Sequence, residues 1–192
     1  MNYKMMGKFI SQILFVEAAF MLPALLISVL ERNIPGIWGF ALSIVITAAV
    51  ASVLYALCRH AVRRFYAREG LVCVGMSWIF MSLLGCLPFF MSGEIPNFLD
   101  ALFEIVSGFT TTGASILSNV EGLSKGMLYW RSFSHWLGGM GVLVFLLAVG
   151  ERGDKGSGFT LHLLRAESPG PTVGKLVPKM RTTARILYMM YI

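Results

Sequence analysis

The chain has 192 residues, of which 56% are apolar and only 14% are charged, and its net charge is +6. An average soluble domain carries about 25% charged residues, and a small soluble globule cannot hide so much apolar surface from water. This composition excludes a disordered chain, a disulfide scaffold and an ordinary cytosolic enzyme, and it predicts an all-α polytopic membrane protein that contacts the lipid bilayer.

Two long apolar runs cover residues 9–30 and 37–58 and are joined by a short polar turn. Each can form a helix of about 20 residues, the length that crosses a bilayer. The first run is too long for the core of a signal peptide and lacks a small-residue cleavage site, which predicts a retained helix. Glu17 lies inside it and is expected to face protein rather than lipid; a structural contact with a neighbouring helix is favoured over a functional role.

Three further apolar runs follow in chain order. A third span is predicted over residues 70–91, with Pro88 near its end, and a fourth over 127–149. A polar stretch covers 150–185, and a fifth run begins at 186 and is cut off at the C-terminus. The third and fourth spans are separated by a shorter apolar segment that is not itself a span.

The distribution of lysine and arginine gives the predicted orientation. If the N-terminus is cytoplasmic, the inside segments are 1–8, 59–69 and 150–185, and they hold all but three of the 16 basic residues. Those three are Arg32, Lys125 and Arg131. Because basic residues concentrate on the cytoplasmic side of membrane proteins, this orientation is favoured over its opposite, and the positive charge does not indicate nucleic-acid binding.

The shorter segment, residues 97–109, cannot cross the bilayer, because a helix rises about 1.5 Å per residue against about 30 Å of hydrocarbon. Asn97 is a good N-cap, and Asp100 follows three residues later, as in a capping box. Apolar residues then recur at helical spacing. The pattern predicts a short re-entrant or interfacial helix that breaks at Gly108.

The residues after this helix are Thr110, Thr111, Thr112 and Gly113. β-Branched threonine favours extended backbone and glycine permits unusual angles, so an extended strand here can turn successive carbonyl oxygens to one side. Such carbonyls can replace the water around a dehydrated cation, and the partial negative charge at the C-terminal end of the helix also favours a cation. The pattern alone leaves open an external amphipathic helix with a threonine-rich loop.

Four stretches resemble the Trk/Ktr potassium transporter superfamily, and most closely its TrkH branch. They are LGCLPF (84–89), FEIVSGFTTTGA (103–114), YWRSFSHWLGGMG (129–141) and ESPGPTVGKLVP (167–178). Their order and spacing match as well. The resemblance runs from about residue 71 to the C-terminus, and residues 1–69 match only as the extra helix pair of that branch. One departure is His135, where many members have glutamine.

The resemblance implies a helix–pore loop–helix repeat, the first of four, preceded by an extra pair of transmembrane helices. The backbone carbonyls of Thr110, Thr111, Thr112 and Gly113 would line the selectivity filter. Potassium would bind at Thr111 and Thr112, and Gly113 is the signature glycine. The residues expected to support the pore are Ser107, Gly108, Glu104, Arg131, Gly138 and Gly141.

Some supporting contacts are expected from the residues themselves. Ser134, Gly138 and Gly141 share one face of the fourth span, and small residues let helices approach closely in lipid. This face is expected to pack against the short helix. Arg131 is expected to form a structural bond with one of three carboxylates, namely Glu104, Glu121 or Asp100. His135 is expected to be packed and hydrogen-bonded rather than to relay protons.

The resemblance also implies a function and partners. The function is potassium uptake across the plasma (inner) membrane of a bacterium, with K⁺ as the transported ion and no organic cofactor in this chain. The partners are a second copy of the full-length protein and a cytosolic, nucleotide-binding RCK-type regulatory subunit similar to TrkA. The chain is interpreted as an N-terminal part: a helix pair with a basic loop (1–69), the first pore repeat (70–149), a cytoplasmic linker (150–185) and the start of a second repeat (186–192).

Three other interpretations belong to different classes. A homotetrameric cation channel would build one filter from four copies, but the extra helix pair and the incomplete fifth run disfavour it. A membrane enzyme needs a nucleophile and a base that face each other, whereas Ser134 and His135 are adjacent on a helix and point about 100° apart. A polytopic membrane protein with a non-transport role is the third alternative.

Overall fold

The computed structural model describes residues 3–59 and 67–140, and the regular structure of these residues is helical throughout. The predicted all-α class is confirmed for this part of the chain. The predicted linker 150–185 and the incomplete run 186–192 lie outside the described residues. The same holds for Gly141, for the end of the fourth predicted span and for the middle of the basic loop.

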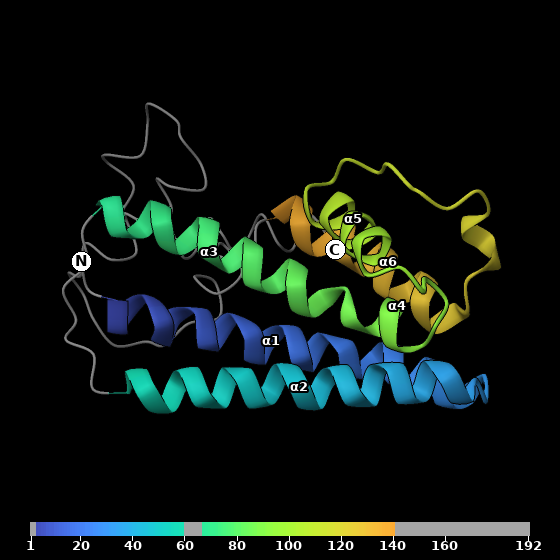
Figure 1. Ribbon diagram of the computed structural model, residues 1–192, viewed down its shortest axis with the longest axis horizontal. Coiled ribbons are helices and arrows are strands. Elements are labelled where there is room, and N and C mark those ends of the chain that lie inside the picture. Colours follow the sequence, from blue (N-terminus) through green and yellow to red (C-terminus); the bar gives the residue numbers. More distant parts are fainter. Residues whose placement is uncertain (1–2, 60–66, 141–192) are drawn as a thin grey trace.

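α1 (Tyr3–Leu30) and α2 (Ile34–Cys58) form an antiparallel hairpin along the molecule (Figure 1). With 28 and 25 residues, the two helices are about 42 and 38 Å long, which is enough to cross about 30 Å of hydrocarbon. Asn33 caps α2, and its side-chain oxygen accepts a hydrogen bond from the Gly36 backbone N–H at 3.2 Å. Pro35 follows in the first turn, where its missing N–H has no helical partner to lose.

α3 (Ala67–Gly85) is followed, after a break at Cys86, by the short α4 (Leu87–Met91). The sequence predicted one continuous run here. The break arises because Pro88 has no backbone N–H and its ring would clash with the carbonyl four residues earlier in an unbroken helix. The stretch Val72–Met91 is still long and apolar enough to cross a membrane, as are α1 and α2. Three of the predicted spans are therefore confirmed as helices of sufficient length and apolar composition.

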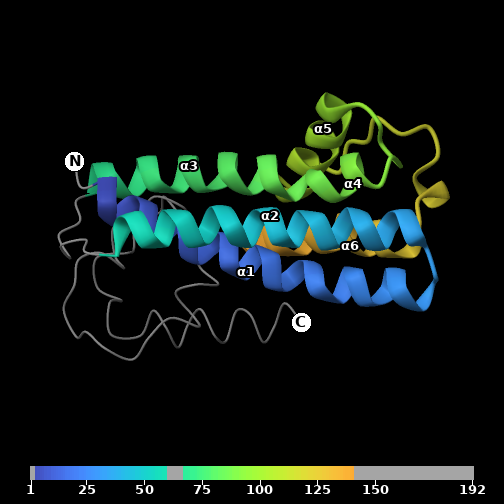
Figure 2. The same ribbon diagram turned by 60° about the horizontal axis from the view of Figure 1, so that its bottom comes forward.

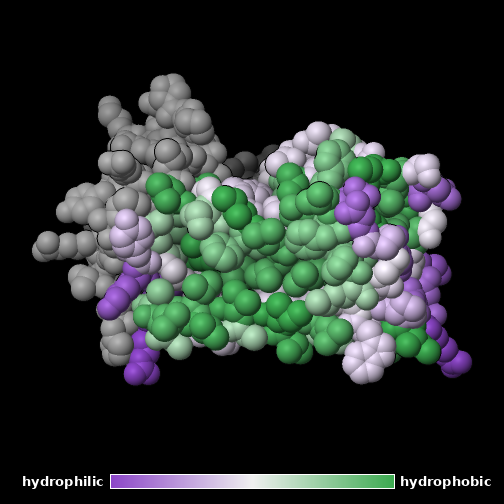
Figure 3. Space-filling view, viewed as in Figure 1, coloured by the Kyte–Doolittle hydropathy of each residue, from purple (hydrophilic) through white to green (hydrophobic). Residues whose placement is uncertain are grey.

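The surface of the molecule is apolar across its middle, with hydrophilic residues gathered towards its ends (Figure 3). α2 contributes a row of large exposed apolar side chains, namely Trp38, Leu42, Val45, Val53 and Leu57. Monomeric soluble proteins rarely expose apolar patches of this extent. This surface is suited to the hydrocarbon of a membrane.

α5 (Phe98–Phe109), the 3₁₀ turn η1 (Val120–Gly122) and α6 (Lys125–Met140) gather with α4 towards one end of the bundle (Figures 1 and 2). With 12 residues, α5 is about 18 Å long and cannot cross the hydrocarbon, as predicted. α1 packs against α2, α3 and α6, and α5 packs against α3 and α6. α1 is thus at the centre of the described helices.

Two carboxylates tie the connecting segments together at this end of the bundle. Glu94 Oε1 accepts a hydrogen bond from Asn33 Nδ2 at 3.3 Å, and Glu94 Oε2 accepts one from the Ser124 backbone N–H at 2.9 Å. Glu31 Oε2 accepts a hydrogen bond from the Lys125 backbone N–H at 3.0 Å. Both N–H groups lie at the N-terminus of α6, where the helix dipole favours negative charge. The turn after α1 is thereby joined to the loop before α5 and to α6.

Replacing Glu94 by alanine should lower the free energy of unfolding of the full-length protein by about 1–2 kcal/mol, because two hydrogen bonds to a charged acceptor are lost at a partly exposed site. Thermal unfolding in detergent would measure the change. Glu121→Ala is the matched control, since Glu121 is an exposed carboxylate in the nearby turn η1. Equal losses of stability in the two variants would contradict the bridging role of Glu94.

Candidate functional site

The candidate site is built on α5, which begins at a side-chain cap. Asn97 is the N-cap, as predicted, and its Oδ1 accepts a hydrogen bond from the Leu99 backbone N–H at 3.0 Å. One face of the helix is buried, and it includes Ala101, Glu104, Ile105 and Gly108. The opposite face exposes Leu99, Phe103 and Val106. The buried face holds the helix in place, and its C-terminal end carries the threonine-rich segment.

α5 does not end at Gly108, as the sequence had predicted, but continues to Phe109 and closes in a Schellman motif. The Thr112 N–H donates to the Ser107 carbonyl at 3.0 Å, and the Thr111 N–H donates to the Gly108 carbonyl at 2.9 Å. These two bonds satisfy carbonyl groups that the last helical turn would otherwise leave unpaired.

This cap places Thr111 in the left-handed region, with φ 56°. The predicted extended strand is therefore wrong for Thr110 and Thr111, because the Schellman cap needs a left-handed residue just after the helix. Glycine or asparagine usually fills such a position, and another residue there costs about 1–2 kcal/mol. Gly113 is also left-handed, with φ 74°.

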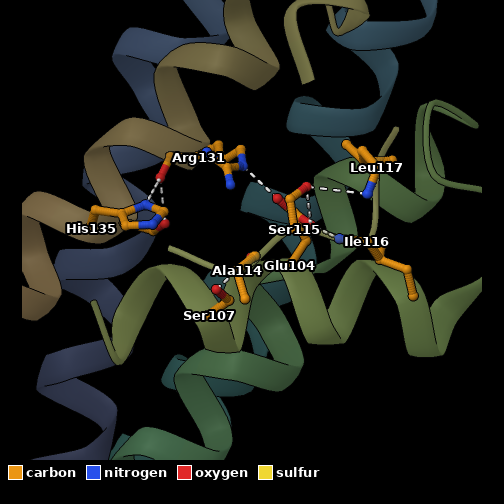
Figure 4. Close-up of polar contacts among 9 residues, drawn as sticks. Glu104, Ser107, Ala114, Ser115, Ile116, Leu117, Arg131 and His135 are labelled. Carbon is orange, nitrogen blue, oxygen red and sulfur yellow. Dashed lines mark hydrogen bonds and ion pairs between the residues drawn. The ribbon is translucent and has the colours of Figure 1, made fainter. Parts of the chain in front are cut away.

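Ser107 holds the segment Thr110–Gly113 from both sides. Its carbonyl accepts hydrogen bonds from the Thr112 N–H and, at 3.5 Å, from the Gly113 N–H. Its hydroxyl donates to the Ala114 carbonyl at 2.6 Å (Figure 4). One residue of the helix thus fixes the backbone on either side of Gly113.

The threonine hydroxyls add two further contacts. Thr110 Oγ1 donates to the Val106 carbonyl at 2.8 Å and lies 2.8 Å from Thr112 Oγ1. Residues 110–116 are nevertheless all exposed in the described structure. The segment is therefore a shaped loop with one open side, and it can form one wall of a passage but cannot by itself surround an ion.

Glu104 joins the short helix to the loop beyond it and to α6 (Figure 4). The carboxylate is fully buried, and Oε1 forms an ion pair with Arg131 Nε. Oε2 accepts hydrogen bonds from the Ser115 hydroxyl at 3.1 Å and from the Ile116 N–H at 3.2 Å. Of the three carboxylates considered for Arg131, the structure selects this one.

Ser115 and Ile116 were not singled out from the sequence. They stand 11 and 12 residues after Glu104, outside the i+3 and i+4 spacing at which helical neighbours are recognised. Only the path of the loop brings them to the carboxylate. A buried acidic residue in a short helix was the one signal that could have indicated such partners.

Small residues bring α6 against α5 with no spare room. A Cβ on Gly108 would lie 2.1 Å from Ser134 Oγ, and a Cβ on Gly138 would lie 2.1 Å from the Phe109 carbonyl oxygen. Ser134 Oγ donates to the Arg131 carbonyl at 2.6 Å, and His135 Nδ1 lies 2.9 Å from the same oxygen. Ser134 and His135 therefore both turn to the backbone of their own helix rather than to each other.

The arrangement of these helices defines a class of protein. A short helix that cannot cross a membrane lies beside helices that are long and apolar enough to cross it, and an exposed loop held by hydrogen bonds follows the short helix. Irregular backbone of this kind is tolerated among membrane-spanning helices where it is buried in protein or lines a water-filled cavity. The arrangement is that of a pore-loop membrane transport protein.

Comparison with known proteins gives the family. The TrkH family, described as cation transport protein, matches residues 38–192, which is well over half of the chain. The chain belongs to this family. The chain is 32% identical over 194 residues to the Trk system potassium uptake protein TrkH of Halomonas elongata. The alignment covers 100% of this chain and 39% of that protein.

Two further relatives agree. The Trk system potassium uptake protein TrkH of Escherichia coli K12 is 30% identical over 195 residues, again covering 100% of this chain and 39% of the relative. The crystal structure of the potassium transporter TrkH from Vibrio parahaemolyticus matches with a TM-score of 0.74 and 26% identity, covering 100% of this chain and 37% of that chain. The chain therefore spans about two-fifths of the length of these curated relatives.

Replacing Gly138 by alanine should displace α5 and destabilise the full-length protein, because the added methyl group would meet the Phe109 backbone oxygen at 2.1 Å and the backbone cannot move aside without the helix. Thermal unfolding in detergent would measure the effect. The control is Gly75→Ala, where nothing lies within 4 Å. That variant should be neutral or gain up to about 1 kcal/mol from helix propensity, and equal damage at the two positions would refute the packing argument.

Replacing Glu104 by glutamine should lower the free energy of unfolding by about 3 kcal/mol, because it leaves the Arg131 guanidinium without its anionic partner in a largely buried site. Thermal unfolding of the full-length protein would measure this loss. The double variant Glu104→Gln/Arg131→Gln should lose less than the sum of the single variants. Additive losses would show that the ion pair does not couple the two helices, and Asp100→Asn on the same helix serves as the control.

Proposed function

We propose that the full-length protein takes up potassium across the plasma (inner) membrane of a bacterium. In this proposal, Thr110, Thr111, Thr112 and Gly113 contribute backbone carbonyls to one quarter of a selectivity filter, with K⁺ at Thr111 and Thr112. The observation that carries it is the fixed loop at the end of α5, in a chain that belongs to the TrkH family. The relatives that support it are named as potassium uptake proteins.

The backbone conformation of the loop supports the role in ion binding. Thr111 and Gly113 have positive φ, while Thr112 between them does not. The N–H groups of Thr112 and Gly113 both point to the Ser107 carbonyl, and because the C=O of a trans peptide points opposite to its N–H, the carbonyls of Thr111 and Thr112 point away from it. A row of carbonyl oxygens is what a dehydrated potassium ion needs. These hydrogen bonds to Ser107 take the place of the extended strand that the sequence had suggested.

The remaining assignments rest on charge and on the family. We propose that the N-terminus is cytoplasmic, because all but three of the 16 basic residues then lie inside. Under this orientation the helix pair (1–69), the pore repeat (70–149), the linker (150–185) and a second repeat beginning at 186 follow in order. A homodimer of the full-length protein with a cytosolic, TrkA-like RCK subunit is the assembly we infer; membership of a "Trk system" in the names of the relatives supports several components.

The substitution Gly113→Ser in the full-length protein should weaken the discrimination of K⁺ from Na⁺ while leaving expression largely intact. Nothing lies within 4 Å of the position of a Cβ at Gly113, so the change acts through the backbone, since a serine resists the left-handed conformation. The measurements are growth at low K⁺ in a strain deficient in K⁺ uptake, and K⁺ and Na⁺ fluxes in liposomes.

Gly93→Ser provides the matched control for this test. Gly93 also has a left-handed backbone, with φ 78°, and it too has nothing within 4 Å. It lies in the loop before α5, away from the proposed filter. Selectivity that is unchanged in Gly113→Ser, or changed equally in Gly93→Ser, would show that the filter has been assigned to the wrong residues.

A further inference from the structure

Glu17 is a carboxyl group in the interior of a membrane-spanning helix. It lies about 20 Å along α1 from either end of the helix, and its side chain has 0% exposure. Neither of its carboxyl oxygens has a hydrogen-bond partner within the described part of the chain. The sequence predicted that Glu17 would face protein and contact a neighbouring helix, and the structure places its carboxyl against Gly85 of α3, without a hydrogen bond to any described residue.

Gly85, at the end of α3, makes room for this carboxyl. A Cβ on Gly85 would lie 2.8 Å from Glu17 Oε1, and 3.2 Å from both Ile105 Cγ1 and Phe109 Cε2. The carboxyl and the last two turns of α5 therefore border the same small volume. On the other side of Gly85, its carbonyl accepts a hydrogen bond from Trp130 Nε1 at 2.9 Å, so α6 holds the same position.

The charged groups of the surrounding helices do not neutralise Glu17. The titratable or charged residues on the elements around α1 are Tyr55 and Cys58 of α2, Arg68, Glu69 and Cys73 of α3, Cys86 before α4, Asp100 and Glu104 of α5, and Lys125, Tyr129, Arg131 and His135 of α6. Arg131 is paired with Glu104. Lys125 begins α6 beside Glu31, and Arg68 is about 25 Å along α3 from Gly85. Buried Cys86 directly follows Gly85 in the chain, and it carries no positive charge.

An ionised carboxylate without a partner is far more costly to bury than a neutral carboxylic acid, so such a group holds its proton. Even the neutral acid loses about 1–3 kcal/mol when its polar atoms are left unsatisfied. Ionisable residues inside membrane segments are rare for this reason and by default indicate function. Glu17 forms no hydrogen bond with the described residues that would offset this cost.

The position of Glu17 connects its proton to the proposed filter. Phe109, which borders the same volume, is the last residue of α5 and directly precedes Thr110. The Phe109 carbonyl also packs so closely against Gly138 that a Cβ there would clash with it. Releasing the proton to the solvent leaves a carboxylate that must draw in water or a cation, and the tightly packed end of α5 has to move to admit them.

We propose that Glu17 is a proton-binding site between α1 and the short helix α5, and that loss of its proton reduces potassium passage by displacing the C-terminal end of α5. The coupling to transport rests on the proposed function; the proton site itself does not.

The test uses the full-length protein in liposomes, with potassium flux measured from neutral to alkaline pH. The wild-type flux should fall several-fold as the pH rises, whereas Glu17→Gln, which has the shape of the acid but no proton to lose, should keep the neutral value throughout. Glu17→Met is a second variant, because an apolar side chain of similar length leaves no buried polar atom unsatisfied. Glu121→Gln, an exposed carboxylate, should retain the wild-type pH profile.

Infrared spectroscopy of the same samples decides the protonation independently of transport. At neutral pH the wild type should show the C=O stretching band of a protonated carboxyl, and this band should be lost in Glu17→Gln but kept in Glu121→Gln. A carboxyl band that persists in Glu17→Gln would overturn the proposal, as would a wild-type pH profile of potassium flux in both Glu17 variants. If no variant passed potassium, the proposed function and the coupling would be refuted, and the band alone would still decide the proton site.

Discussion

The short length of α5 is the constraint on which the rest of the structure depends. A helix of 12 residues ends within the span of its longer neighbours, where lipid offers no partner for backbone N–H and C=O groups. Those groups must be satisfied within the protein or by water in a cavity. The Schellman cap at Thr111 and the bonds from Ser107 meet this requirement. The same bonds give the following loop one fixed shape.

Rigidity at this helix end has several independent sources. Glu104 links α5 to Arg131 and to the loop at Ser115 and Ile116, while Gly138 lets the Phe109 carbonyl approach α6 closely. Thr111 adopts a backbone conformation that its β-branched side chain disfavours, and such strain persists only where the surroundings over-determine it. The proposed filter needs this kind of support, because it would select an ion by the placement of its carbonyls.

The first two helices are integral to this arrangement. α6 crosses α1 so closely that a Cβ on Gly126 would lie 2.1 Å from Ser28 Oγ, and Phe20 of α1 meets the Phe133 ring with a centroid distance of 4.9 Å. Glu17 reaches the space beside Gly85 and α5. α1 is therefore packed against the same helices that hold α5, and the proposed proton site at Glu17 lies between α1 and α5.

The sequence by itself determined the membrane class, three of the spanning segments and the short helix with its Asn97 cap, because hydrophobic length and local capping are properties of consecutive residues. It did not determine the break at Cys86, the left-handed Thr111 or the partner of Arg131. Helix ends close through bonds whose geometry depends on how the chain continues, and Glu104 has partners 11 and 27 residues away. The tertiary structure alone decided that Glu17 lies beside α5 without a hydrogen bond among the described residues, since burial from every side is a property of the packed helices and not of any one of them.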